Sequence, residues 1–105
     1  MVSKLNANDL HTRLSNTEGF TLVTFTDTWN PACSRFEPLF DRVAVEKRDI
    51  PSFLVDVDTN PEIAGRYGVR SVPDLVLLKD GRPVSRSAGM MSEDQIKNWL
   101  ARYGL

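Results

Sequence analysis

Cysteine and histidine are almost absent from this 105-residue chain, which contains only Cys33 and His11. A single cysteine excludes an internal disulfide, and one cysteine and one histidine far apart provide no set of metal ligands. We therefore expect neither a metal ion nor a bound cofactor. Long apolar runs are also missing, since none approaches the ~20 residues of a membrane-spanning helix, and the first residues lack the apolar segment of a secretory signal. These absences favour a cytoplasmic protein that does not enter a membrane.

An excess of charge of one sign is missing as well. Thirteen Lys and Arg residues and fourteen Asp and Glu residues give a formal net charge of −1. Because no run is strongly basic, nothing indicates binding to nucleic acid or to an anionic membrane surface. Hydrophobic residues make up 41% of the chain, enough for a core without disulfides or metals. We expect residues 1–105 to form one monomeric domain, with a dimer linked through Cys33 as a product of oxidation.

The beginning of the chain contains patterns typical of a helix followed by a strand. Asn6 is suited to cap an initial helix, with Leu5 and Leu10 at the positions of a hydrophobic staple across that cap. The segment Phe20–Thr26 is β-branched and aromatic, which predicts a strand. A short additional strand at the start of the chain is left open by the sequence.

A long helix is predicted to begin after Asn30. A residue before proline is driven toward extended geometry, and proline is favoured at the first helical position. Asn30 therefore suits the cap of a helix that begins at Pro31. The following apolar residues have the spacing of a buried helical stripe, namely Phe36, Leu39, Phe40, Val43 and Ala44. Because Pro38 lies within this stripe, we expect a kink there and not the end of the helix.

The second half of the chain predicts three further strands. Residues 53–57, 74–78 and 84–88 form these strands, and residues 79–82 carry the signal of a hairpin turn between the last two. Pro83 has no amide hydrogen to donate to a neighbouring strand, which places the last strand at an edge of the sheet.

Two more helices complete the prediction. Asn60 and Pro61 repeat the pairing of a cap with a first-turn proline and open a short helix that stops by Gly68. Ser92 and Gln95 have the spacing of a capping box. The final helix they open has an inner face of Ile96, Trp99, Leu100 and Tyr103.

The order of these elements determines the expected fold class. Strands separated by helices require parallel pairing, whereas the hairpin adds an antiparallel pair. The sequence therefore predicts an α/β protein with a mixed central β-sheet and helices on both faces.

Residues 29–33, Trp-Asn-Pro-Ala-Cys, resemble the active-site motif of the thioredoxin family, which has Trp-Cys-x-x-Cys at the start of a long helix kinked by proline. Here Pro38 stands at the place of the kinking proline. Residues 67–73 resemble the segment that leads into the cis-proline of the family, Gly89 matches the glycine after its last strand, and residues 56–61 match its Asp-x-Asp-x-Asn-Pro run. The resemblance covers nearly the whole chain and implies the thioredoxin fold.

Three residues depart from the family pattern. Asn30 stands in place of the first cysteine, the nucleophile of the family. Thr24 replaces a buried aspartate that assists proton transfer in many thioredoxins, and Asp74 replaces the threonine that usually follows the cis-proline. The resemblance implies protein-disulfide reductase activity, but the first departure removes the residue that starts the reaction.

Disulfide exchange begins when a thiolate attacks a substrate sulfur and forms a mixed disulfide, which a second thiol then resolves. Asn30 neither ionises nor attacks sulfur; its side chain is suited to accept a hydrogen bond from the amide of Ala32 or Cys33. Cys33 occupies the resolving position. The helix N-terminus lowers the pKa of its thiol and apolar surroundings raise it, so that an inert buried thiol and a slow reactive thiol both stay open.

The leading interpretation is a binding, adaptor or chaperone-like module that keeps the substrate groove of the family and has lost its nucleophile. Its partner is a protein or an extended peptide, which pairs with backbone beside the cis-proline. The alternative is a thiol–disulfide oxidoreductase, which acts through Cys33 as a single thiol or is the silenced Asn30 variant of an active thioredoxin. The groove is expected to contain Trp29, Pro31, Ala32, Val72, Pro73, Gly89 and Met90.

Two of these residues have structural alternatives. Trp29 either lines the groove or covers the start of the helix, and Met90 and Met91 either border the groove or pack between loop and helix.

Overall fold

The computed structural model describes residues 2–4, 12–14 and 16–105, and residues 12–14 and 16 are helical. The remaining described elements, in chain order, are β1 (Val2–Lys4), β2 (Phe20–Thr26), α2 (Pro31–Glu46), β3 (Ser52–Asp56), α3 (Pro61–Arg66), β4 (Asp74–Lys79), β5 (Arg82–Ala88) and α4 (Glu93–Ala101). The cap and staple predicted at Asn6, Leu5 and Leu10, together with His11, lie outside the described residues.

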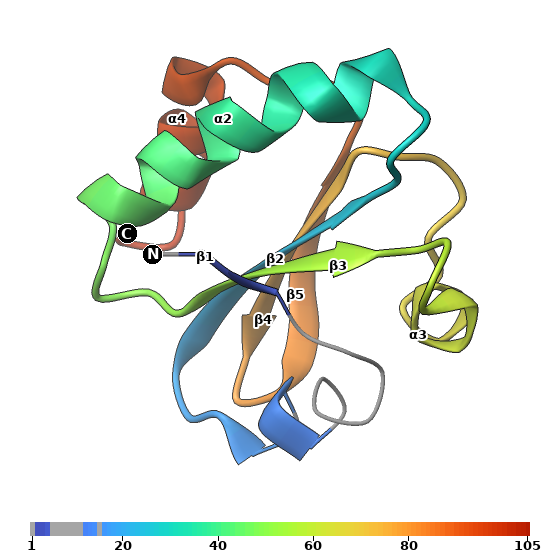
Figure 1. Cartoon of the computed structure of the whole chain (residues 1–105). Coiled ribbons are helices and arrows are strands. Elements are labelled where there is room, and N and C mark those ends of the chain that lie inside the picture. Colours follow the sequence, from blue (N-terminus) through green and yellow to red (C-terminus); the bar gives the residue numbers. More distant parts are fainter. Residues whose placement is uncertain (1, 5–11, 15) are drawn as a thin grey trace.

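The strands form one mixed sheet in the order β1-β3-β2-β4-β5. β3 runs parallel to both β1 and β2, whereas β4 pairs antiparallel with β2 and with β5 (Figure 1). The predicted mixed sheet is therefore confirmed. The additional strand at the start of the chain, which the sequence left open, is present as β1. Pro83 lies in β5, at the edge of the sheet, as its missing amide hydrogen required.

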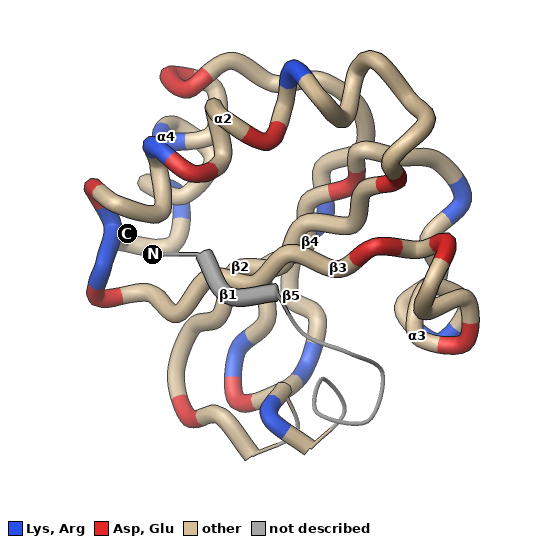
Figure 2. Tube along the Cα trace, in the orientation of Figure 1, with Lys and Arg blue, Asp and Glu red and all other residues tan. Residues whose placement is uncertain are grey.

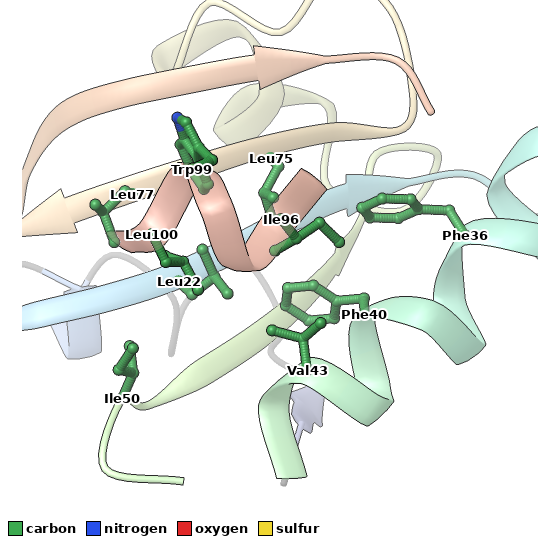
Figure 3. Packing of buried hydrophobic residues seen from close by; sticks show 10 residues of the cluster. All are labelled: Leu22, Phe36, Phe40, Val43, Ile50, Leu75, Leu77, Ile96, Trp99 and Leu100. Carbon is green, nitrogen blue, oxygen red and sulfur yellow. The ribbon is translucent and has the colours of Figure 1, made fainter. Parts of the chain in front are cut away.

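Helices cover both faces of this sheet, as predicted. Helices α2 and α4 lie on one face, where their apolar side chains meet alternate residues of the central strands (Figure 3). This cluster contains Leu22, Phe36, Phe40, Val43, Ile50, Leu75, Leu77, Ile96, Trp99 and Leu100. On the other face, α3 contributes Ile63 to a second cluster with Leu14, Val23, Phe25, Phe53, Val55, Val76 and Leu78. Because successive strand residues point to opposite faces, the same strands supply both cores.

The boundaries of the strands follow their pairing more closely than their composition. β2 covers the predicted residues, but β3 begins one residue earlier than predicted and ends at Asp56, because Ser52 pairs with both neighbouring strands. β4 and β5 extend to Lys79 and Arg82, since the hairpin turn consists only of Asp80 and Gly81. Both turn residues have positive φ, 51° and 82°, as in the type I′ turn that joins twisted strands.

Of the three helix caps predicted within the described residues, two are found in the structure. α2 begins at Pro31 with Asn30 as its cap and continues past Pro38 to Glu46. Ser92 and Gln95 form the predicted capping box of α4. Asn60 stands at the cap position of α3, but the prediction that its side chain caps the helix is wrong. The side chain instead donates to the carbonyl of Asp56 at 2.9 Å and to Thr59 Oγ1 at 3.0 Å.

Tyr103 lies beyond the end of α4, not on its inner face. Its ring is half-buried and contacts the ring of Phe20 at a centroid distance of 6.4 Å. None of the described helices is both long enough and apolar enough to cross a membrane. Acidic and basic residues are interspersed over the described chain (Figure 2), in keeping with the nearly balanced composition.

Candidate functional site

The loop between β2 and α2 is held by Asp27. Its carboxylate oxygen Oδ1 accepts hydrogen bonds from the amides of Trp29 and Asn30, at 3.1 and 2.6 Å. This short-range turn orients the chain for the start of the helix. The backbone of Asn30 is extended, with φ −88° and ψ 117°, as expected for a cap before proline.

The side chain of Asn30 uses both of its polar atoms. Oδ1 accepts from the amide of Ala32 at 2.9 Å, which confirms the predicted cap. Nδ2 donates to the carbonyl of Val72 at 3.1 Å, although Val72 is 42 residues away in the sequence. Sequence reasoning missed this second bond, because no local pattern indicates which carbonyl faces a capping side chain.

Val72 and Pro73 bring a third segment to the site. The peptide bond between them is cis, and the carbonyl of Pro73 accepts a hydrogen bond from the amide of Gly89 at 2.9 Å. The start of α2, the loop before β4 and the turn after β5 therefore meet at one end of the sheet. The expected site residues Trp29 to Cys33, Val72, Pro73, Gly89 and Met90 all belong to these three segments.

Exposure distinguishes the roles of the apolar side chains at this site. Trp29 is 84% exposed and Met90 is 45% exposed. An indole so open to water does not cover the start of the helix, and its place in a groove stays a prediction. Met91 is half-buried and packs against the core beneath α4. Both methionines line a pocket with residues of α4, which favours packing between loop and helix, and a groove-bordering role of Met90 stays a prediction.

A surface pocket adjoins Val72. It has a volume of about 380 Å³ and lies between α3 and the loop before β4. Its lining is mostly apolar and consists of Val57, Pro61, Ala64, Gly65, Val69, Arg70, Ser71 and Val72. Sequence reasoning identified only Val72 among these residues, since the pocket forms only when α3 folds back against the loop.

Cys33 is fully buried in the first turn of α2. Burial raises the pKa of its thiol above the ordinary value, a backbone hydrogen bond from Asp27 acts in the opposite direction, and the carboxylates of Asp27 and Glu37 raise the pKa further. The net direction is upward, so this thiol is not made acidic in the folded chain.

Comparison with known proteins identifies the family. The family model described as Thioredoxin matches residues 1–102. The chain belongs to the thioredoxin family. It is 31% identical to thioredoxin of Bacillus subtilis over 100 residues, which cover 94% of this chain and 96% of the relative. It is 32% identical to thioredoxin of Chlamydia trachomatis over 85 residues, covering 81% and 83%, and 44% identical to thioredoxin of Mycobacterium tuberculosis over 69 residues, covering 65% and 60%.

Thr24 and Asp74, the two other residues that depart from the family pattern, lie near each other on neighbouring strands, but their side chains point to different faces of the sheet. Thr24 is buried, and its hydroxyl donates to the carbonyl of Asp74 at 3.2 Å. Asp74 lies on the same face of β4 as Val76, which packs in the cluster with Phe25. Its side chain therefore points to the face opposite α2 and Cys33, where it forms an ion pair with Arg86.

Proposed function

We propose that this thioredoxin-family chain binds extended segments of partner proteins and does not catalyse dithiol–disulfide exchange. One observation carries the proposal. The position that a nucleophilic cysteine would occupy holds Asn30, whose carboxamide is bonded to Ala32 on one side and to Val72 on the other. The first active-site position is thus part of the scaffold that holds the groove together.

The chemistry of the single thiol supports the loss of catalysis. Dithiol catalysis needs one thiolate to attack and a second thiol to release the product. Cys33 is the only cysteine of the chain, is fully buried, and has a pKa raised by that burial. The alternative in which Cys33 alone forms mixed disulfides has less support, because both its burial and its protonated state at neutral pH oppose attack.

The geometry around Val72 supports the binding of an extended segment. The backbone amide of Val72 makes no hydrogen bond to another described residue, so it is available to a partner strand. Trp29 and Met90 present exposed apolar surface on the same three-segment site. Aromatic and methionine side chains of this kind are enriched in protein interfaces.

The pocket beside Val72 offers room for one partner side chain. Its walls are largely aliphatic, from Val57, Val69 and Val72, so an apolar side chain two residues from the paired backbone fits its chemistry. We place this activity in a single domain of residues 1–105, acting as a cytoplasmic monomer in an adaptor or chaperone-like role.

Selection from a library of random peptides displayed on phage tests this function directly. The peptide selected on the immobilised chain is synthesised, and its affinity is measured for the original protein, for Trp29→Ala and for Val45→Ala. Val45 is 56% exposed on α2 and is the matched control. We expect Trp29→Ala to weaken binding by about tenfold or more, as for an interface aromatic, and Val45→Ala to leave it unchanged. Failure to select any peptide, or equal affinities, would contradict the proposal.

A further inference from the structure

The segment between Gly68 and Pro73 contains Val72 and Pro73, which form the rim of the proposed groove. One side chain, that of Arg86, bonds to both ends of this segment. The segment follows α3 and precedes β4, and it contains no regular secondary structure. Within it, the amide of Val69 donates to the carbonyl of Ala64 and the carbonyl of Val72 accepts from Asn30, and further bonds act at its two ends. The first end is at Tyr67 and Gly68, and the second is at Asp74.

Arg86, on the edge strand β5, binds both ends at once. Its Nη1 donates to the carbonyl of Gly68 at 3.2 Å and its Nη2 to the carbonyl of Tyr67. Its Nε pairs with Oδ2 of Asp74 at 3.3 Å. A planar guanidinium presents donors in a fixed fork, whereas the single ammonium group of lysine cannot reach three separated oxygens.

The surroundings of Arg86 fit this arrangement closely. The Asp74 side chain is only 3% exposed, against 38% for Arg86, and a buried carboxylate is costly unless it is paired. Gly68 has a φ of +69°, and a Cβ there would lie 3.3 Å from Nη1 of Arg86. Glycine therefore supplies both the backbone conformation and the space that the guanidinium occupies.

We infer that Arg86 and Asp74 are positioning residues for the groove, which hold the segment before Pro73 in its binding shape without touching the partner. This inference rests on the proposed function. The pair lies on the face of the sheet opposite Cys33 and Asn30, so it acts only through the segment. The carbonyl of Val72, bonded to Asn30, and the pocket formed by Val69 and Val72 both depend on where this segment lies.

The test compares Arg86→Lys with Arg82→Lys. Arg82 is exposed on the same strand, and its side chain forms no hydrogen bond or ion pair to a described residue, so it is the matched control. The first measurement is amide hydrogen exchange by NMR. In Arg86→Lys, we expect exchange of the Val69 amide, which donates to the carbonyl of Ala64, and of the side-chain amide of Asn30 to rise about tenfold or more, with the amides of β2 and α2 unchanged. Equal exchange in both variants, or a rise spread over the whole chain, would overturn the inference.

The second measurement is affinity for the peptide selected on the original protein. We expect Arg86→Lys to lower this affinity about tenfold, because the partner must then order the segment as it binds, and Arg82→Lys to leave it unchanged. Asp74→Ala is the second variant and removes only the partner of Arg86 Nε. Its affinity for the peptide is expected to lie between those of Arg86→Lys and Arg82→Lys. A modest loss of stability would not lower the measured affinity tenfold, because nearly all molecules of a stable domain stay folded.

The outcomes separate the two proposals. If the original protein binds the peptide and Arg86→Lys binds it equally well, the positioning role is wrong and the proposed function stands. If no peptide is selected, the proposed function is wrong, and the exchange measurement by itself then supports or overturns the positioning role.

Discussion

The side-chain amide of Asn30 donates a hydrogen bond to the main-chain carbonyl of Val72 across 3.1 Å, while the oxygen of the same side chain caps α2 at Ala32. Asn30 thus joins the start of α2 to the loop before β4. A cysteine at this position offers only a weak S–H donor and a weak sulfur acceptor on one atom, and cannot replace the two separate polar atoms of the carboxamide. The carboxamide therefore fixes the geometry between the start of α2 and the loop before β4.

Removal of the Asn30 side chain should lower the stability of the fold. Asn30→Ala deletes both hydrogen bonds, and we expect the free energy of unfolding to fall by about 1–3 kcal/mol, from the lost cap and the lost bond to a carbonyl. Urea denaturation measures this change. Asn98→Ala, at an exposed position of α4, is the control and should be neutral or slightly stabilising, since alanine is the better helix former. Equal effects of the two changes would contradict a role for Asn30.

Asn30→Cys should restore dithiol chemistry. The new cysteine would stand at the N-terminus of α2, which lowers the pKa of a thiol there, and Cys33 would resolve the mixed disulfide. We expect an intramolecular disulfide after mild oxidation, and reduction of insulin that is slower than with a full thioredoxin because Thr24 cannot relay protons. Counts of free thiols and an insulin assay measure both. The control is Asn30→Cys combined with Cys33→Ser; a folded Asn30→Cys protein without an internal disulfide would refute the match to the motif.

The thiol of Cys33 should be slow to alkylate near neutral pH. It is buried, and its raised pKa keeps it protonated, so iodoacetamide should react at least about tenfold faster after denaturation in urea. Mass spectrometry follows both reactions. Labelling of the folded protein at the rate of a free thiol would instead support single-thiol chemistry.

Stability should also depend on the ionisation of Cys33 at high pH. Because its folded pKa is raised, the unfolded chain releases the proton first, and the stabilising contribution of the thiol is lost as pH rises through the folded pKa. The free energy of unfolding relative to Cys33→Ser should therefore fall between about pH 8 and about pH 10. A difference that is constant over this range would contradict the raised pKa.

Asp74 should make the fold relatively less stable as it ionises. Burial raises the pKa of its carboxyl above the ordinary 3.8, and Arg86 and the backbone amide of Leu75 only partly oppose this. The folded protein therefore holds the proton more tightly than the unfolded chain. Its stabilising contribution is complete below the ordinary pKa and is lost as pH rises through the folded value.

The measurement for Asp74 is urea denaturation of the original protein and of Asp74→Asn between about pH 4 and about pH 7. The stability of the original protein relative to the variant should decrease with rising pH over this window. A relative stability that increases with pH would mean that Arg86 outweighs burial, and that the ion pair stabilises the fold in addition to any positioning role.

Prediction from the sequence succeeded where the signal lies within a few residues. The cap at Asn30, the capping box at Ser92, the hairpin turn at Asp80 and Gly81, and the edge position of Pro83 each follow from local backbone chemistry. It was less accurate where pairing decides the outcome, as at the start of β3, and it was wrong at Asn60, whose side chain found other acceptors nearby.

By itself, the sequence determined the class of fold, the family and the missing nucleophile, because periodicity, turn residues and a motif are properties of neighbouring residues. Only the tertiary structure decided what the remaining residues do. Burial raises the pKa of the Cys33 thiol, the Asn30 side chain donates to the carbonyl of Val72, and Arg86 bonds to Tyr67, Gly68 and Asp74. Each of these depends on groups distant in sequence that are brought together in an environment shielded from water, where hydrogen bonds and charges have effects that composition cannot indicate.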